Sequence, residues 1–203
     1  HFHEYYISRF TPVIFRPISM KNSYVKKILD ALKLIIVEPD AFMWIMVYFC
    51  MALDGHIKDS AILLLVGEGS NGKSFLLELL TNTLSEMYAR KLPLTTLTGQ
   101  RPSAEKANPS LYELKYARAV YYSEANACAS INVGALKEML GQEKLSVRQN
   151  YGEQENIRPH CIHISTSNYD YEIDCTDWGT WRRIYYYRCK MKFDANPEPG
   201  NKY

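Results

Sequence analysis

The residues best suited to chemistry stand in one run, GEGSNGKS, from Gly67 to Ser74. This run fills the pattern G-x-x-x-x-G-K-[ST], which is the phosphate-binding P-loop. Glycines let such a loop turn its backbone N–H groups onto phosphate oxygens, because no Cβ blocks the approach. The residues predicted to bind the nucleotide are therefore Gly67, Glu68, Gly69, Ser70, Asn71, Gly72, Lys73 and Ser74.

Lys73 and Ser74 carry the predicted chemistry of this loop. Lys73 would reach the β- and γ-phosphates of ATP, and the Ser74 hydroxyl would ligate Mg²⁺. A helix beginning there would add the positive end of its dipole. A chance match to the pattern occurs in roughly one chain in a hundred of this length at average glycine usage, and a flanking strand and helix make chance rarer still.

Three further positions could complete a phosphate-cleaving site. Glu124 follows an expected strand and could activate water and hold Mg²⁺. Asn168 ends another expected strand, where its amide could hold the attacking water, although a turn-forming asparagine is the default interpretation. Arg182 and Arg183 begin a further expected strand. Either could stabilise transition-state charge on a neighbouring subunit's nucleotide, or form a surface ion pair.

These residues need a framework, and the hydropathy pattern indicates a parallel sheet. Residues 61–66 (AILLLV) are apolar without alternation, as in a strand buried on both faces. The helix from Lys73 is expected to extend as far as Arg90. Further expected elements are strands at 117–122, 145–151, 157–166 and from the arginine pair on, and a helix at 131–140.

The strands at 145–151 and 157–166 outline a β-hairpin around the turn-rich GEQEN. Basic residues beside it could contact nucleic-acid phosphates: Lys144, Arg148 and Arg158. Glu153 and Glu155 at the expected tip weaken that interpretation. Tyr151 could stack on a base, but an ordinary strand-end tyrosine is at least as good an interpretation.

Two helices are expected before the core, one from residue 23 to about 37 and one over 41–53. The second is almost continuously apolar, but its 13 residues fall short of the roughly 20 that a bilayer requires. We therefore expect a buried helix and no membrane partner. The chain is divided into a lead-in and helical segment (1–58), a P-loop domain (59–195) and a tail (196–203). Its ending without an evident final element suggests a piece of a longer protein.

Composition bears on the size of the core, on possible partners and on the redox compartment. With 47% apolar residues, the 203-residue chain can bury a full core, and its net charge of +2 neither demands nor excludes a nucleic-acid partner. The five cysteines are scattered without a C-x-x-C pair. This favours free thiols in a reducing compartment over a disulfide or zinc site.

The order of the motifs resembles the superfamily 3 helicases, in particular poxvirus-type helicase-primases and phage or plasmid primase-helicases. The resemblance covers about residues 61–193 and rests on GEGSNGKS, RAVYYSE, LKEMLGQEKLSVR, IHISTSN and WGTWRRI. By position it makes Gly67–Ser74 the Walker A motif, Glu124 the Walker B glutamate, Asn168 sensor 1, and Arg182 or Arg183 the arginine finger. The GQE at 141–143 departs from the family's usual two glycines and an acid.

The resemblance implies an AAA+-like P-loop NTPase fold with a β-hairpin insertion and a short N-terminal helical segment. It implies a DNA helicase that hydrolyses ATP with Mg²⁺ between the subunits of a homo-hexamer. Single-stranded or forked DNA would pass through the ring, and a primase domain would lie in the same full-length chain. The setting would be intracellular, at a viral or phage replication site.

Two alternatives stay open. A nucleotide-binding assembly module without turnover would explain the single Walker B carboxylate, since Ser123 occupies the usual aspartate position. A P-loop small-molecule kinase would share the loop, but it would need an acceptor pocket and an arginine-rich lid, and the sequence contains no evident lid segment.

Overall fold

The computed structural model describes residues 9–55, 59–99, 108–123, 129–141, 144–148, 150 and 152–194. At its centre lies a five-stranded sheet in the order β2-β3-β6-β1-β7, and every neighbouring pair in it is parallel. The strands are β1 (Ile62–Val66), β2 (Ala89–Pro93), β3 (Ala119–Ser123), β6 (Ile162–Ser167) and β7 (Ile184–Arg188). The predicted α/β class with a central parallel sheet is confirmed.

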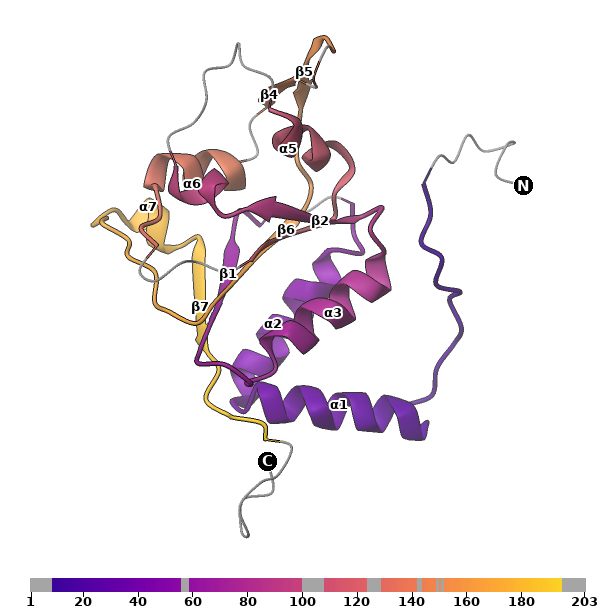
Figure 1. The fold of residues 1–203 in the computed structure, drawn as a ribbon. Coiled ribbons are helices and arrows are strands. Elements are labelled where there is room, and N and C mark those ends of the chain that lie inside the picture. Colours follow the sequence, from indigo (N-terminus) through magenta and orange to yellow (C-terminus); the bar gives the residue numbers. More distant parts are fainter. Residues whose placement is uncertain are drawn as a thin grey trace, which may run out of the picture.

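Helices cover both faces of this sheet (Figure 1). One layer holds α1 (Ser23–Ile35), α2 (Pro39–Met51) and α3 (Lys73–Leu84). The other holds the short α4 (Thr95–Thr98), α5 (Pro109–Tyr112) with the 3₁₀ turn η1 (Glu113–Tyr116), and α6 (Val133–Leu140). A two-stranded antiparallel hairpin, β4 (Leu145–Arg148) and β5 (Gln154–Ile157), lies beyond α5. The short α7 (Trp178–Trp181) leads into β7.

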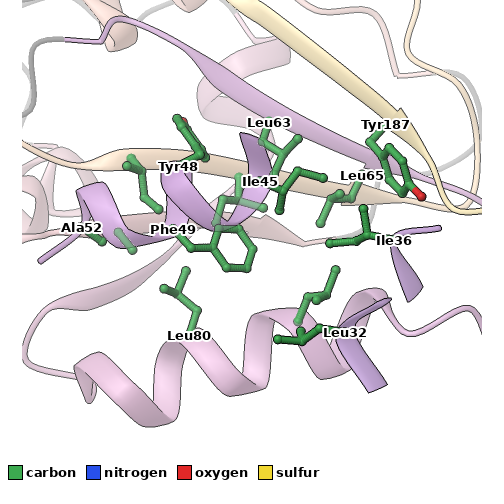
Figure 2. Close-up of a cluster of buried hydrophobic side chains, with 14 of the residues drawn as sticks. Leu32, Ile36, Ile45, Tyr48, Phe49, Ala52, Leu63, Leu65, Leu80 and Tyr187 are labelled. Atoms are coloured by element: carbon green, nitrogen blue, oxygen red, sulfur yellow. The ribbon is translucent and has the colours of Figure 1, made fainter. Parts of the chain in front are cut away.

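The core is split by the sheet because alternate side chains of a strand point to opposite faces. Leu63 and Leu65 of β1 pack with Ile45 and Phe49 of α2, as Figure 2 shows, while Ile62 and Leu64 belong to the opposite cluster. All five β1 residues are buried. Burying each such side chain contributes about 1.5–3 kcal/mol, which explains why the uninterrupted apolar run becomes an interior strand, between β6 and β7.

Local signals set the helix boundaries. Asn22 caps α1 by accepting a hydrogen bond from the Tyr24 N–H at 2.9 Å, and Pro39 stands at the start of α2. The predicted extension of the P-loop helix to Arg90 is wrong. The helix α3 ends at Leu84, where Ser85 takes a positive φ of 62°, and β2 begins at Ala89 as an edge strand.

The hairpin prediction is correct in outline but wrong in its strands. The first strand ends at Arg148, and the returning strand is Gln154–Ile157, whose first three residues were predicted to be part of the turn. Glu155 pairs with Val147 in the ladder, and its carboxylate lies 2.5 Å from Lys115 Nζ. This contact connects β5 to η1. Residues 158–161 then separate β5 from β6.

Two expectations concern membrane-spanning helices and the state of the cysteines. No single helix in the described ranges is long and apolar enough to cross a bilayer; α1 and α2, bent by 118° at their junction, meet the criteria of length and composition only as a pair. The four described cysteines are free thiols: Cys50, Cys161, Cys175 and Cys189. The predicted tail, 196–203, lies outside the described residues.

Candidate nucleotide-binding site

The P-loop run joins the carboxyl end of β1 to the start of α3. Gly72 has a φ of +85°, and a Cβ at this position would lie 2.5 Å from Cγ1 of Ile35 in α1. Glycine alone avoids both the strained backbone and the collision. Since α3 begins at Lys73, the unpaired N–H groups of its first turn lie at the loop, as phosphate binding requires.

A cavity of about 320 Å³ lies at this loop, and two separate segments line it. The loop contributes Gly69 to Ser74, and the end of β6 contributes Thr166, Ser167 and Asn168. Val66 pairs with Ser167, so β1 and β6 end level with each other. The structure thus brings Asn168 into the same cavity as Lys73 and Ser74.

Lys73 is buried within the loop, with 8% of the residue exposed. Its Nζ donates hydrogen bonds to Gly67 O at 2.5 Å, Asn71 Oδ1 at 2.7 Å and Glu68 O at 3.2 Å. Burial lowers the pKa of Lys73, with the nearby Cys189 acting in the opposite direction. Since these three acceptors are uncharged, the ammonium leaves a net positive charge at the cavity that Lys73 lines.

Glu124, the predicted catalytic acid, lies outside the described residues, as does Tyr151. The strand before Glu124 is in place, because β3 pairs in parallel with β6 and Tyr122 stands opposite Ser165. The carboxyl end of β3 therefore lies at the same edge of the sheet as the P-loop and Asn168. No group of three or more His, Cys, Asp or Glu side chains that could hold a metal ion occurs among the described residues.

Arg182 and Arg183 lie at the other edge of the sheet. The backbone carbonyl of Arg183 accepts a hydrogen bond from the Ile62 N–H at 2.8 Å, at the start of β1, whereas the P-loop follows the end of that strand. The intervening strand spans about 13 Å at 3.3 Å per residue. Neither arginine is therefore brought to the cavity of its own chain.

The two arginines also differ from each other. Arg182 is exposed, and among the described residues its side chain has no hydrogen-bond partner. Arg183 is half-buried: its Nη1 donates to the Gly179 carbonyl, and its Nε is buried without a partner in the described part of the chain. Arg183 also lines a polar cavity of about 610 Å³ together with Lys137, Glu138 and Lys144.

The basic residues of the hairpin are on the surface. Lys144, Arg148 and Arg158 are exposed, immediately before β4, at its end and immediately after β5. The Arg148 Nε donates to the Gly152 carbonyl at 3.0 Å, across the mouth of the turn. Its own carbonyl accepts a hydrogen bond at 3.0 Å from Asn108 at the start of α5, which ties the hairpin to the body of the molecule.

Sequence reasoning missed a second cavity, which adjoins the first. It has a volume of about 370 Å³, shares Ser70 and Gly72 with the phosphate cavity, and is otherwise lined by apolar side chains. These are Ala31, Leu34 and Ile35 of α1, Phe75 of α3, and Phe193. The Phe193 N–H donates to the Ser70 carbonyl at 2.7 Å, which fixes this segment beside the loop. Nothing local in the sequence connects α1 or Phe193 to the P-loop.

Comparison with known proteins matches the part of the chain that contains the P-loop and most of the central sheet. A family model described as a family of unknown function (DUF5906) matches residues 65–183. Over its whole length, the chain is 40% identical to a protein named putative primase C962R from African swine fever virus (strain Badajoz 1971 Vero-adapted), of which it covers 21%. It is 31% identical, over 89% of its length, to a putative helicase L207/L206 of Acanthamoeba polyphaga mimivirus, of which it covers 18%.

The fold is shared with a solved structure, the C-terminal region of NrS-1. The two superpose with a TM-score of 0.65 at 19% sequence identity, covering 87% of this chain and 39% of the other. At this identity the likeness concerns the fold. The chain spans about a fifth of the length of the curated relatives cited here.

Proposed function

Since this chain belongs to the family of unknown function DUF5906 and is of the superfamily 3 helicase-primase type, we propose that it is the ATPase domain of a replicative DNA helicase. It couples ATP hydrolysis to movement along single-stranded DNA and to duplex unwinding. The relatives named as a putative primase and putative helicases support a role in viral DNA replication inside the host cell. Because the chain corresponds to a fifth of those proteins, a primase domain in the same full-length chain is part of the proposal.

The observation that carries the proposal is the shared cavity of Lys73, Ser74 and Asn168. The loop N–H groups and the Lys73 ammonium bind the triphosphate, and its β- and γ-phosphate oxygens take over the role of the neutral acceptors around Nζ. Ser74 and Glu124 would hold Mg²⁺, which would neutralise part of the phosphate charge when bound. Glu124 accepts the proton of the attacking water, and the Asn168 amide orients that water.

The adjoining apolar cavity suits the base of the same nucleotide. It shares two loop residues with the phosphate cavity, so one ligand can occupy both. Phe75 and Phe193 contribute aromatic side chains to its lining, and Ile35 contacts the loop from α1. The helical segment before the core therefore completes the ATP site in this proposal.

Hydrolysis then requires a second subunit. The phosphate cavity and the arginine pair lie at opposite edges of one sheet, so an arginine finger must act on a neighbouring copy, as in a ring. Arg182 is the better candidate, because it is exposed while Arg183 is held by Gly179. The proposed assembly is a homo-hexamer with DNA at its centre, contacted by Lys144, Arg148 and Arg158.

The experiment that tests this function measures phosphate release with and without single-stranded DNA, and strand displacement on forked DNA. Wild-type protein should show DNA-stimulated hydrolysis and unwinding. Lys73→Ala should lower hydrolysis by at least about a hundredfold, because it removes the cation that stabilises charge on the transferred phosphate.

Stimulation by a nucleoside acceptor in place of DNA would point to a kinase. ATP binding without any turnover would point to an assembly module. Either outcome would overturn the proposed function.

A further inference from the structure

Asn168 depends on its loop for its orientation. It lines the phosphate cavity, yet its side chain makes no hydrogen bond to any residue in the described ranges. The turn is fixed on the strand side, where the Tyr169 N–H donates to Ser167 Oγ at 2.9 Å. A water-orienting amide has to be held within a fraction of an ångström, so the other side of the loop needs an anchor as well.

Asp170 supplies that anchor from two residues further on. Its Oδ1 accepts a hydrogen bond from the Tyr186 hydroxyl at 2.6 Å. Nη2 of Arg188 donates to Oδ1 at 2.5 Å and to Oδ2 at 2.6 Å. One carboxylate thus joins the loop after β6 to two residues on the same face of β7. We call Asp170, Tyr186 and Arg188 the clamp.

The clamp spans the strand that carries the P-loop. Ser167, Val66 and Arg188 form one row across β6, β1 and β7 at the carboxyl edge of the sheet. The Cys189 N–H donates to the Val66 carbonyl at 2.8 Å, so β7 is in register with β1 up to the residue before Gly67. The Asp170 carboxylate reaches from the first strand of this row to the third. It therefore fixes the Asn168 loop relative to the start of the phosphate-binding loop.

We propose that the clamp positions Asn168 over the phosphate cavity, so that Asp170, Tyr186 and Arg188 are positioning residues for ATP hydrolysis. The inference rests on the proposed function, because it assigns Asn168 the water-orienting role given there. An ion pair this exposed (side chains 51% and 63% exposed) adds little to folding stability. The ion pair instead fixes the geometry of the loop, so its loss should lower the kcat of ATP hydrolysis.

The first measurement is steady-state ATP hydrolysis by Asp170→Asn, which keeps the shape of the side chain and removes its charge. We expect kcat to fall about tenfold or more, since a small misplacement of a catalytic group is costly, with KM changed less than about twofold because the P-loop is intact. Arg188→Lys should keep more activity than Arg188→Ala, and Tyr186→Phe should show a smaller loss. The matched control is Glu113→Gln, which weakens another ion pair, between the exposed Glu113 and the half-buried Arg90.

The second measurement separates positioning from a general structural effect. In an Asn168→Ala background, Asp170→Asn should cause no further loss of kcat, because the group it positions is gone. Multiplicative losses in the double variant, or an unchanged kcat in Asp170→Asn, would overturn the clamp while leaving the ATPase in place. A wild-type protein without DNA-dependent hydrolysis would overturn the proposed function, and the clamp with it. Thermal unfolding of each variant checks that it is folded.

Discussion

Two buried basic side chains, Lys73 and His163, are held in opposite ways. Lys73 sits among oxygen acceptors, which suit an ammonium. His163, the second residue of β6, has the Tyr122 hydroxyl 2.9 Å from Nδ1 and the Cys161 thiol 3.5 Å from Nε2. Neither neighbour carries a charge at neutral pH. Complete burial lowers the pKa of His163 to about 4, so the imidazole is neutral in the folded protein.

This burial predicts a pH-dependent stability. In the unfolded chain His163 takes up a proton below its ordinary pKa of 6.5, whereas the folded protein does so only near 4. Above pH 6.5 the neutral His163 therefore costs the folded protein nothing. The free energy of unfolding should decrease by up to about 3 kcal/mol as the pH falls from 6.5 to 4. Urea unfolding at a series of pH values measures the decrease.

The matched comparison is His163→Gln, whose stability should depend less on pH over the same range. NMR of the imidazole in the wild-type protein gives a second measure, with the ring still neutral at pH 5. An equal pH dependence in the variant and the wild type, or an imidazole that titrates near 6.5, would contradict the prediction.

At the scale of elements, the hairpin is the part that the proposal assigns to DNA. Arg148 is exposed at the end of β4 and is tied to the turn and to α5 through its own bonds. Arg148→Ala should weaken binding to single-stranded DNA and reduce the slope of log K against log[salt] by about one unit, because one phosphate contact is lost. Fluorescence anisotropy across a salt series measures both quantities.

The control is Lys33→Ala, which removes one exposed charge from α1, in the layer on the other face of the sheet. Its affinity and salt slope should match those of the wild-type protein. If Arg148→Ala and Lys33→Ala gave the same slopes, the hairpin would not be the contact surface.

Elements with a strong local pattern were predictable from the sequence. The uniform apolar run gave β1, and the glycine-lysine motif fixed the start of α3. The elements missed or misplaced depend on distant partners. β2 becomes a strand by pairing with β3 at the sheet edge. β5, whose residues resemble a turn, pairs with β4 and contacts Lys115 of η1 through Glu155.

The same limit applies to the candidate site. The strand ends that line the phosphate cavity follow from chain order and parallel topology, so Lys73, Ser74 and Asn168 could be named in advance. The apolar cavity could not, because Ile35 and Phe193 reach the loop from far along the chain on either side. Asp170 was hidden for a similar reason: its partners lie on β7.

At the scale of the whole molecule, the proposal makes hydrolysis a property of two copies. Arg182→Ala should retain ATP binding and lose hydrolysis by about a thousandfold, as expected for removal of a finger acting in trans. Mixing it with Lys73→Ala should restore activity, since interfaces form that pair an intact loop with an intact arginine. Phosphate release at a series of mixing ratios measures the rescue.

Arg183→Ala serves as the comparison. Its guanidinium bonds the Gly179 carbonyl within its own chain, so we expect a loss of stability that no partner restores. Absence of rescue for Arg182→Ala, in mixtures shown to co-assemble, would rule out a role in trans.

The placement of loop and arginine at opposite ends of β1 gives each copy a front and a back. In the proposed ring the copies follow one another head to tail, so that the loop of one copy meets the arginine of the next. Any open row then leaves one terminal loop without its arginine. Closure into a ring gives every loop the arginine of a neighbour, so the activity per subunit should rise at the protein concentration where rings close.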